Sequence, residues 1–238
     1  MGLLFAGISW VAYVAVEPLV RRVSPHMLVS WSRLLAGKWT DPLVGRDLLL
    51  GVAVGLAADW IGGIENILPW WKNIPGATFG TPPRWVLGST ADATAWVFSN
   101  LWQGVLIALL FVFLFVGGRA LFRNRWVPFI FILLVLNAQD LTSSSHPLLT
   151  MAFNVPAATL MVATIGFLGP LSTAAAFFAG NIAYRIAGVG VGAWYGPRCT
   201  AYVLLLVGLA VFGFRCAVAG RAIFGGAETD QTSSAAAD

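Results

Sequence analysis

Two histidines are the side chains in this sequence that could bind the metal of a porphyrin-type cofactor. His26 and His146 are its only histidines, and imidazole is a common axial ligand of such metals. The membrane topology derived below places them on opposite faces, so one mononuclear metal ion could not use both. Each is otherwise an ordinary interfacial or loop residue. The sequence leaves the cofactor unknown, and the classes that we consider are (bacterio)chlorophyll, carotenoid and lipid.

Asp59 is a third candidate, because it interrupts an apolar stretch that is long enough to enter a membrane. A carboxylate is costly in hydrocarbon, so an acid at such a depth is by default a candidate functional residue. The alternative is that the helix has already reached the interface, since Trp60, Gly62 and Gly63 follow. No nucleotide-binding glycine loop, zinc-ligand spacing, nucleophile elbow or paired-carboxylate arrangement occurs in the sequence. We therefore expect that the protein is not an enzyme.

Composition places these side chains in an integral membrane protein. The 238 residues are 58% hydrophobic and 10% charged, and their mean hydropathy is +0.81, well outside the range of soluble domains. A helix needs about 20 apolar residues to cross a bilayer. Residues 1–226 are expected to form one all-α membrane domain, and residues 227–238 a polar C-terminal tail. About six transmembrane spans are predicted, at residues 2–20, 42–62, 96–117, 127–141, 156–180 and 199–219.

An additional helix is predicted on the cytoplasmic membrane surface between the first two spans. Ser24-Pro25 is typical of a helix start, and an amphipathic pattern follows it. Trp31 and Leu35 lie on the apolar arc of this pattern, and Arg33 lies on the opposite arc. A helix of this kind lies in the plane of the membrane. We therefore expect Trp31 and Leu35 to face the lipid and Arg33 to face the cytoplasm.

The second predicted span carries a helix-packing pattern. Gly51 and Gly55 are separated by three residues, and small residues at this spacing lie on one helix face, where a neighbouring helix can approach closely. The pattern indicates a contact between helices and says nothing of a ligand or a reaction.

Basic residues orient the predicted spans. The segments 21–47, 118–126 and 181–198 hold ten of the 14 Lys and Arg residues, and such segments usually face the cytoplasm. The net charge of +4 then fits contacts with anionic lipid headgroups better than binding to nucleic acid. We expect a multi-pass protein of the bacterial cytoplasmic (inner) membrane, whose partners are the lipid bilayer and other membrane subunits.

Three stretches carry a resemblance to a known family. The membrane region at the C-terminus of certain large bacterial serine/threonine protein kinases resembles the runs WVAYVAVEPLVRR (10–22), SPHMLVSWSRLLAGKWTDPLVGRDLLLG (24–51) and AWYGPRCTAYVLLLVGLAVFGFRCAVAGRAIFGG (193–226). In those kinases a separate catalytic domain precedes the membrane helices. The present sequence contains no glycine-rich loop, His-Arg-Asp catalytic loop or Asp-Phe-Gly motif. The resemblance therefore implies a shared membrane architecture without the kinase activity, and it assigns no role to individual residues.

Two classes of function are consistent with these patterns. The first is a non-catalytic accessory or scaffolding transmembrane subunit of a larger complex, with a photosynthetic reaction centre or another electron-transfer assembly as the host. The 11 tryptophans and 16 phenylalanines would suit helices that cover pigments, although they also suit an interfacial aromatic belt. The second is a membrane sensor or signalling module that acts with a separately encoded kinase or effector. A kinase-type membrane region without its kinase favours the subunit.

Overall fold

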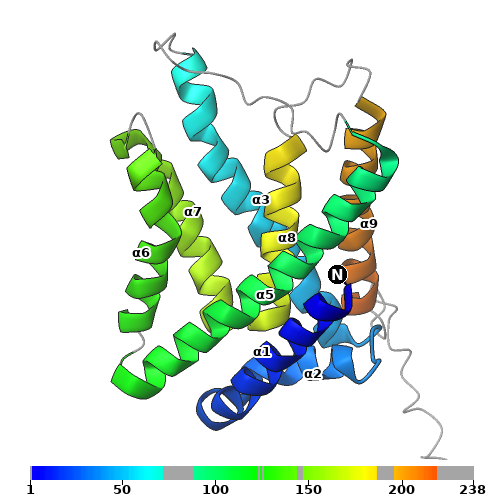
Figure 1. The fold of residues 1–238 in the computed structure, drawn as a ribbon, viewed down its shortest axis with the longest axis vertical. Coiled ribbons are helices and arrows are strands. Elements are labelled where there is room, and N and C mark those ends of the chain that lie inside the picture. The colour runs from blue at the N-terminus through cyan, green and yellow to red at the C-terminus, as the bar shows by residue number, and fades with distance from the viewer. Residues whose placement is uncertain are drawn as a thin grey trace, which may run out of the picture.

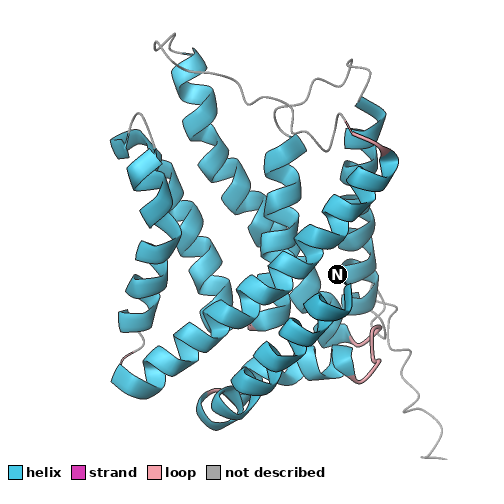
Figure 2. Cartoon of the chain, in the orientation of Figure 1, coloured by secondary structure: helices cyan, strands magenta, loops and turns pink. Residues whose placement is uncertain are grey.

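The computed structural model of this chain describes residues 2–71, 88–122, 124, 126–143, 147–186 and 196–218. These residues are almost entirely helical, and no strand occurs among them (Figure 2). The predicted all-α class is therefore confirmed. The helices are α1 (Gly2–Val23), the 3₁₀ helix η1 (Pro25–Leu28), α2 (Val29–Leu35), α3 (Pro42–Trp71), α5 (Thr90–Phe122), α6 (Trp126–Ser143), α7 (Pro147–Phe167), α8 (Pro170–Ile186) and α9 (Gly196–Val218).

Membrane character is carried by four of these helices. By length and composition, four segments in the described part of the chain are able to cross a bilayer: Pro42–Ile64, Thr90–Phe122, Pro147–Phe167 and Cys199–Val218. The apolar segment Trp126–Ala138 of α6 is shorter. The structure thus shows an all-helical protein with four candidate membrane-spanning helices, and the predicted count of about six is not confirmed.

The predicted fifth span, 156–180, is wrong, because these residues belong to two helices. α7 ends at Phe167 and α8 begins at Pro170, and the chain reverses its direction between them (Figure 1). Gly169 makes the reversal with φ of +92°, a conformation that glycine adopts without steric cost. A Cβ on Gly169 would also collide with the carbonyl oxygen of Met27. Pro170 suits the first position of the new helix, where no N–H is needed.

Because α7 and α8 are two helices where one span was predicted, α9 runs in the direction opposite to the expected one. Tyr202, near the start of α9, donates a hydrogen bond of 3.3 Å to the carbonyl of Ala93 at the start of α5. At the other end of α9, Gly213 lies against the backbone of Gly45 in α3. The predicted grouping of segments 181–198 and 21–47 on one face is therefore wrong, because the turn at residues 168–169 adds one more reversal.

α8 is the central helix of the bundle. It packs mainly against α3 on one side and α5 on the other, and small side chains make both contacts close. Along α3, Gly51 lies against the Ser172 backbone and Gly55 against the Ala176 backbone. On α5, a Cβ at Gly104 would lie 3.0 Å from the Ala174 carbonyl oxygen. Small residues allow such close approach of helix backbones in membranes.

The segment from η1 to α2 folds beneath the bundle. Met27 and Trp31 are buried in a core cluster with Val112, Phe115 and Ile165 from α5 and α7. This cluster holds η1 and α2 against the end of the bundle at which α1 ends and α3 begins.

Candidate functional site

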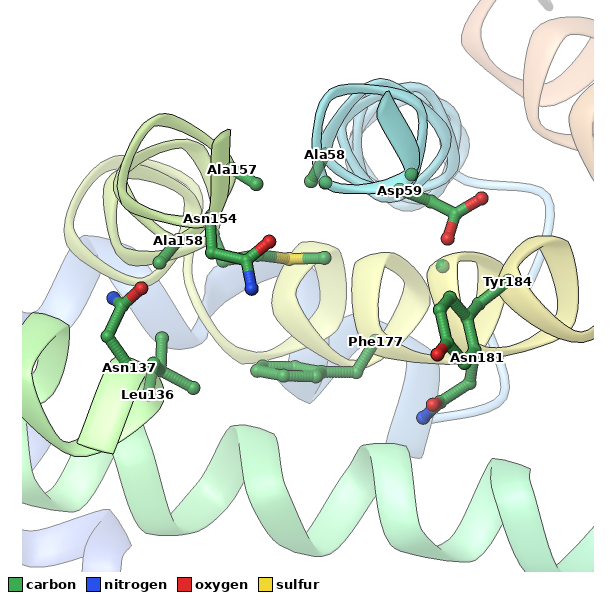
Figure 3. Close-up of a pocket in the computed structure, with 14 residues that line it drawn as sticks. Ala58, Asp59, Leu136, Asn137, Asn154, Ala157, Ala158, Phe177, Asn181 and Tyr184 are labelled. Carbon is green, nitrogen blue, oxygen red and sulfur yellow. The ribbon is translucent and has the colours of Figure 1, made fainter. Parts of the chain in front are cut away.

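A polar cavity lies among α3, α6, α7 and α8 and has a volume of about 330 Å³. Six of its lining residues are glycine or alanine, which leaves the space open: Ala58, Gly62, Gly63, Ala157, Ala158 and Gly180. The remaining lining residues are Asp59, Leu136, Asn137, Asn154, Met161, Phe177, Asn181 and Tyr184. We call this space the Asp59 cavity (Figure 3). Its volume lies at the lower end of the range for small-molecule pockets.

Among the described residues that line the cavity, Asp59 is the charged one. It lies in Pro42–Ile64, the part of α3 that is long and apolar enough to cross a membrane, and in Figure 3 its carboxylate points along the cavity toward Tyr184 of α8. Among the described residues, none forms a hydrogen bond or an ion pair with this carboxylate. An acid at this position is expensive in the absence of a partner. The cavity wall therefore holds a carboxyl group that has no compensating partner among the described residues.

Side-chain amides from three helices face the same cavity. Asn154 of α7 points into its centre (Figure 3), and Gly62 of α3 leaves room for this amide, because a Cβ there would lie 3.1 Å from Asn154 Oδ1. Asn137 of α6 donates a 2.8 Å hydrogen bond to the Leu133 carbonyl, which fixes the orientation of its amide. Asn181 of α8 completes the set. Amides supply both donors and acceptors, so the wall can bind a polar molecule.

The lower part of the cavity wall is apolar. Phe177, Leu136 and Met161 contribute hydrocarbon or thioether surface, and in Figure 3 the ring of Phe177 lies on the opposite side of the cavity from Ala58. A mostly apolar wall with a few convergent polar groups is typical of small-molecule sites. Within the described residues, no group of three His, Cys, Asp or Glu side chains could hold a metal ion.

The opposite end of the bundle is basic. The ends of α1, α5 and α9 and the beginning of α3 lie at this end (Figure 1), and the described basic residues belong to these segments and to the stretch from α2 to α3. We call this surface the basic end, and its residues are Arg21, Arg22, Arg33, Lys38, Arg46, Arg119 and Arg215. Arg119 of α5 donates a 3.3 Å hydrogen bond to Ser24 Oγ, which joins the end of α5 to the end of α1.

Three acids neutralise part of the basic end. The ion pairs are Arg21–Glu17 at 2.7 Å, Arg33–Asp41 at 2.6 Å and Arg46–Asp47 at 2.8 Å. Arg21 and Glu17 are four residues apart on α1, a spacing that places both side chains on one helix face. The seven described cations exceed these three acids, so the end keeps a positive charge that suits anionic headgroups.

The surface helix differs from its prediction. It ends at Leu35 and starts as the 3₁₀ turn η1. Trp31 is only 7% exposed and packs into the protein core, so it does not face lipid. Arg33 forms an ion pair with Asp41, and its orientation toward the cytoplasm stays a prediction. Leu35 is 57% exposed, and its contact with lipid stays a prediction. The pattern misplaced Trp31 because an apolar arc suits a protein core as well as a membrane.

The two histidines contribute no described side chain to a site. The backbone of His26 lies in η1, but its side chain is outside the described residues, and His146 lies wholly outside them. Pigment ligation by either histidine therefore stays a prediction.

Sequence reasoning identified Asp59 as a candidate and missed the residues around it. Asn137, Asn154, Asn181 and Tyr184 belong to three other helices, and nothing in local spacing predicts that they share a cavity. A signal was present nonetheless, since side-chain amides inside apolar helices are uncommon and usually face a bundle interior.

Comparison of the chain with protein-family models, with curated proteins and with solved structures finds no match.

Proposed function

We propose that this protein is a multi-pass membrane module that receives a small polar ligand in the Asp59 cavity and acts on a partner protein. The observation that carries the proposal is the Asp59 carboxylate. It lines a cavity, lies in the part of α3 that is long and apolar enough to cross a membrane, and has no bonding partner among the described residues. Ionisable residues in membranes usually mark ligand or ion sites. This proposal corresponds to the sensor class of function, and it requires no chemical reaction.

α8 is the element that would carry a signal from the cavity. Asn181 and Tyr184 near its end line the Asp59 cavity, whereas its beginning at Gly169-Pro170 lies against the Met27 backbone at the basic end. Between these points α8 is buried on several faces, and its buried side chains include Ala175, Ala176 and Ala179. A closely packed helix shifts as a unit, so a ligand that moves its cavity end would also change the contacts of η1 and α2.

A cavity-filling substitution tests this proposal. Ala158 lines the cavity from α7, and Ala158→Leu would occupy much of the space that a ligand needs. We expect wild-type protein in lipid nanodiscs to show ligand-dependent thermal stabilisation in a screen of small polar compounds, and Ala158→Leu to lose it. The matched control is Ala152→Leu on the exposed face of the same helix. Equal stabilisation of both variants by the same compound would contradict the proposal.

A second candidate function is the accessory subunit, and the position of α1 favours it. α1 packs chiefly against α5 and η1 at the edge of the bundle, and its Trp10 side chain is 65% exposed. Val11 and Val14 extend this apolar strip, which the helix of another subunit could cover. A photosynthetic or other electron-transfer complex is the specific host within this proposal. Mass spectrometry and absorbance of complexes isolated from native membranes in mild detergent would identify the partners and any pigment.

A further inference from the structure

We infer that the Asp59 cavity selects a small organic cation of the ammonium type. This inference rests on the proposed function, and it adds the charge and the approximate size of the ligand.

Charge is the first argument. The Asp59 carboxylate has no described partner, and the described basic side chains lie at the other end of the bundle. Arg46, the nearest of them along α3, is about 20 Å from Asp59 at a rise of 1.5 Å per residue. A cation brought in by a ligand would supply the missing compensation, whereas an anion would add a second negative charge to a poorly solvated site.

The neighbouring groups are the second argument. Tyr184 lines the same cavity as Asp59, and the Asp59 carboxylate is directed toward it in Figure 3. Aromatic faces attract ammonium groups. The amide oxygens of Asn154 and Asn181 can accept hydrogen bonds from an N–H. A carboxylate, an aromatic ring and neutral oxygens together match an ammonium group and offer an anion no fixed positive charge.

Size and polarity complete the description of the ligand. A cavity of about 330 Å³ suits a molecule at the small end of the usual ligand range. Phe177, Leu136 and Met161 provide an apolar surface that would cover a short hydrocarbon chain. The ligand class is therefore a small alkylammonium ion, with its charge at Asp59 and its hydrocarbon part on the apolar wall.

Titration calorimetry on the full chain in nanodiscs tests this inference with four probes that differ in charge. The probes are n-butylammonium, tetramethylammonium, n-butanol and n-butyrate, and titrations into empty nanodiscs are subtracted. We expect n-butylammonium to bind at least about tenfold more tightly than n-butanol, since charged hydrogen bonds exceed neutral ones by this order. Tetramethylammonium, which lacks N–H donors, should fall between them, and n-butyrate should show no binding.

Variants assign the preference to the carboxylate. Asp59→Asn should remove the difference between n-butylammonium and n-butanol, whereas Asp59→Glu should retain it. Asp92→Asn, which removes an exposed acid outside the cavity, should leave the preference unchanged. Thermal unfolding of each variant confirms that it is folded, and the pair of Asp59 variants separates loss of charge from loss of structure.

Four outcomes would overturn the inference, and they differ in what they mean for the proposed function. If n-butanol bound as tightly as n-butylammonium, or if Asp59→Asn kept the preference, the cavity would bind ligands without selecting cations. If no probe or screening compound depended on Ala158 for its binding, the proposed function would fail as well.

Arg185 follows Tyr184 in the sequence, and its side chain is outside the described residues. Cation binding that arose only in Arg185→Gln would show that this arginine neutralises Asp59 in the native protein.

Discussion

At the residue scale, Asp41 shows how one side chain fixes the start of a membrane helix. Its Oδ1 accepts a 2.9 Å hydrogen bond from the Leu43 backbone N–H, and its Oδ2 accepts one of 2.6 Å from Arg33 Nη1. Asp41 is thus the N-cap of α3, and Pro42 occupies the first helical position, where its missing N–H costs no hydrogen bond. The same carboxylate ties α2 to α3, because Arg33 belongs to α2.

Asp41 predicts a loss of stability in acid. The Leu43 backbone hydrogen bond, and then Arg33, hold the pKa of this carboxyl below its ordinary value of 3.8. Because the folded pKa lies below the unfolded one, the contribution to stability is complete above about pH 4 and disappears as the pH falls through the folded pKa. Asp41→Asn should therefore lower the Tm at pH 7 and bring variant and wild type closer near pH 3. Thermal unfolding in nanodiscs at both pH values measures this, and a Tm difference that grew in acid would contradict it.

Gly169 carries a different kind of residue-scale constraint, which only the assembled fold reveals. Its positive φ makes the α7–α8 turn, and the Met27 backbone occupies the place of a side chain. In a sequence, a Gly-Pro pair such as Gly169-Pro170 has the same local signature for a kink within one span and for a reversal between two helices. The choice is made by the long-range packing of η1 against the turn.

At the element scale, the contact between α3 and α8 depends on small residues. A Cβ on Gly55 would collide with the Ala176 carbonyl oxygen, and one on Gly51 would lie 2.7 Å from the Ala175 Cβ. Gly180 of α8 lies against the Gly55 carbonyl in the same way, at 3.2 Å for its added Cβ. This seam brings Asp59 and Tyr184 to the same cavity, so the packing and the site are built by one contact.

Gly55→Ala should therefore destabilise the bundle. Overpacking of a well-packed contact costs about 1–3 kcal/mol, and the atom that Cβ would meet is backbone, which cannot rotate away. Denaturation of purified protein by sodium dodecyl sulfate, followed by circular dichroism, measures the free energy of unfolding. Gly208→Ala on α9 is the matched control, because no atom lies within 4 Å of its added Cβ. Equal stability of the two variants would show that α3 and α8 are not closely packed.

The helices could be predicted from the sequence more readily than the cavity could. Hydrophobic length located α1, α3, α5, α6 and α9, since each is a continuous apolar segment with recognisable starts. The faces that meet could not be predicted, because the whole surface of a membrane helix is apolar and periodicity does not separate lipid from protein contact. Trp31 was misplaced for this reason, and the three asparagines of the cavity stayed unassigned.

At the scale of the whole molecule, charge is divided between two ends. Arg21, Arg46 and Arg215 belong to the end of α1, the beginning of α3 and the end of α9, and these three helix ends lie at the basic end (Figure 1). Asp59 and Asp92 lie in the other half, where no basic side chain is described. Lys and Arg near membrane helices usually stay in the cytoplasm, so we expect the basic end to face the cytoplasm and the Asp59 cavity to lie toward the opposite side.

This arrangement yields a prediction that separates the observed fold from the topology expected with six spans. With α7 and α8 as separate helices, the start of α9 lies at the end away from Arg22, and its Arg215 end lies at the basic end. The earlier topology had the start of α9 on the cytoplasmic face. Single cysteines at Arg22, Arg215 and Thr200, in a background with Cys199 and Cys216 replaced by alanine, should distinguish the two. A membrane-impermeant maleimide added to intact cells should label Thr200→Cys, and should label Arg22→Cys and Arg215→Cys only after the membrane is opened.

Labelling of Arg22→Cys and Thr200→Cys from the same side would show that the chain does not reverse at Gly169. Labelling of both arginine positions in intact cells would keep the fold but invert its orientation, so that the Asp59 cavity would open toward the cytoplasm.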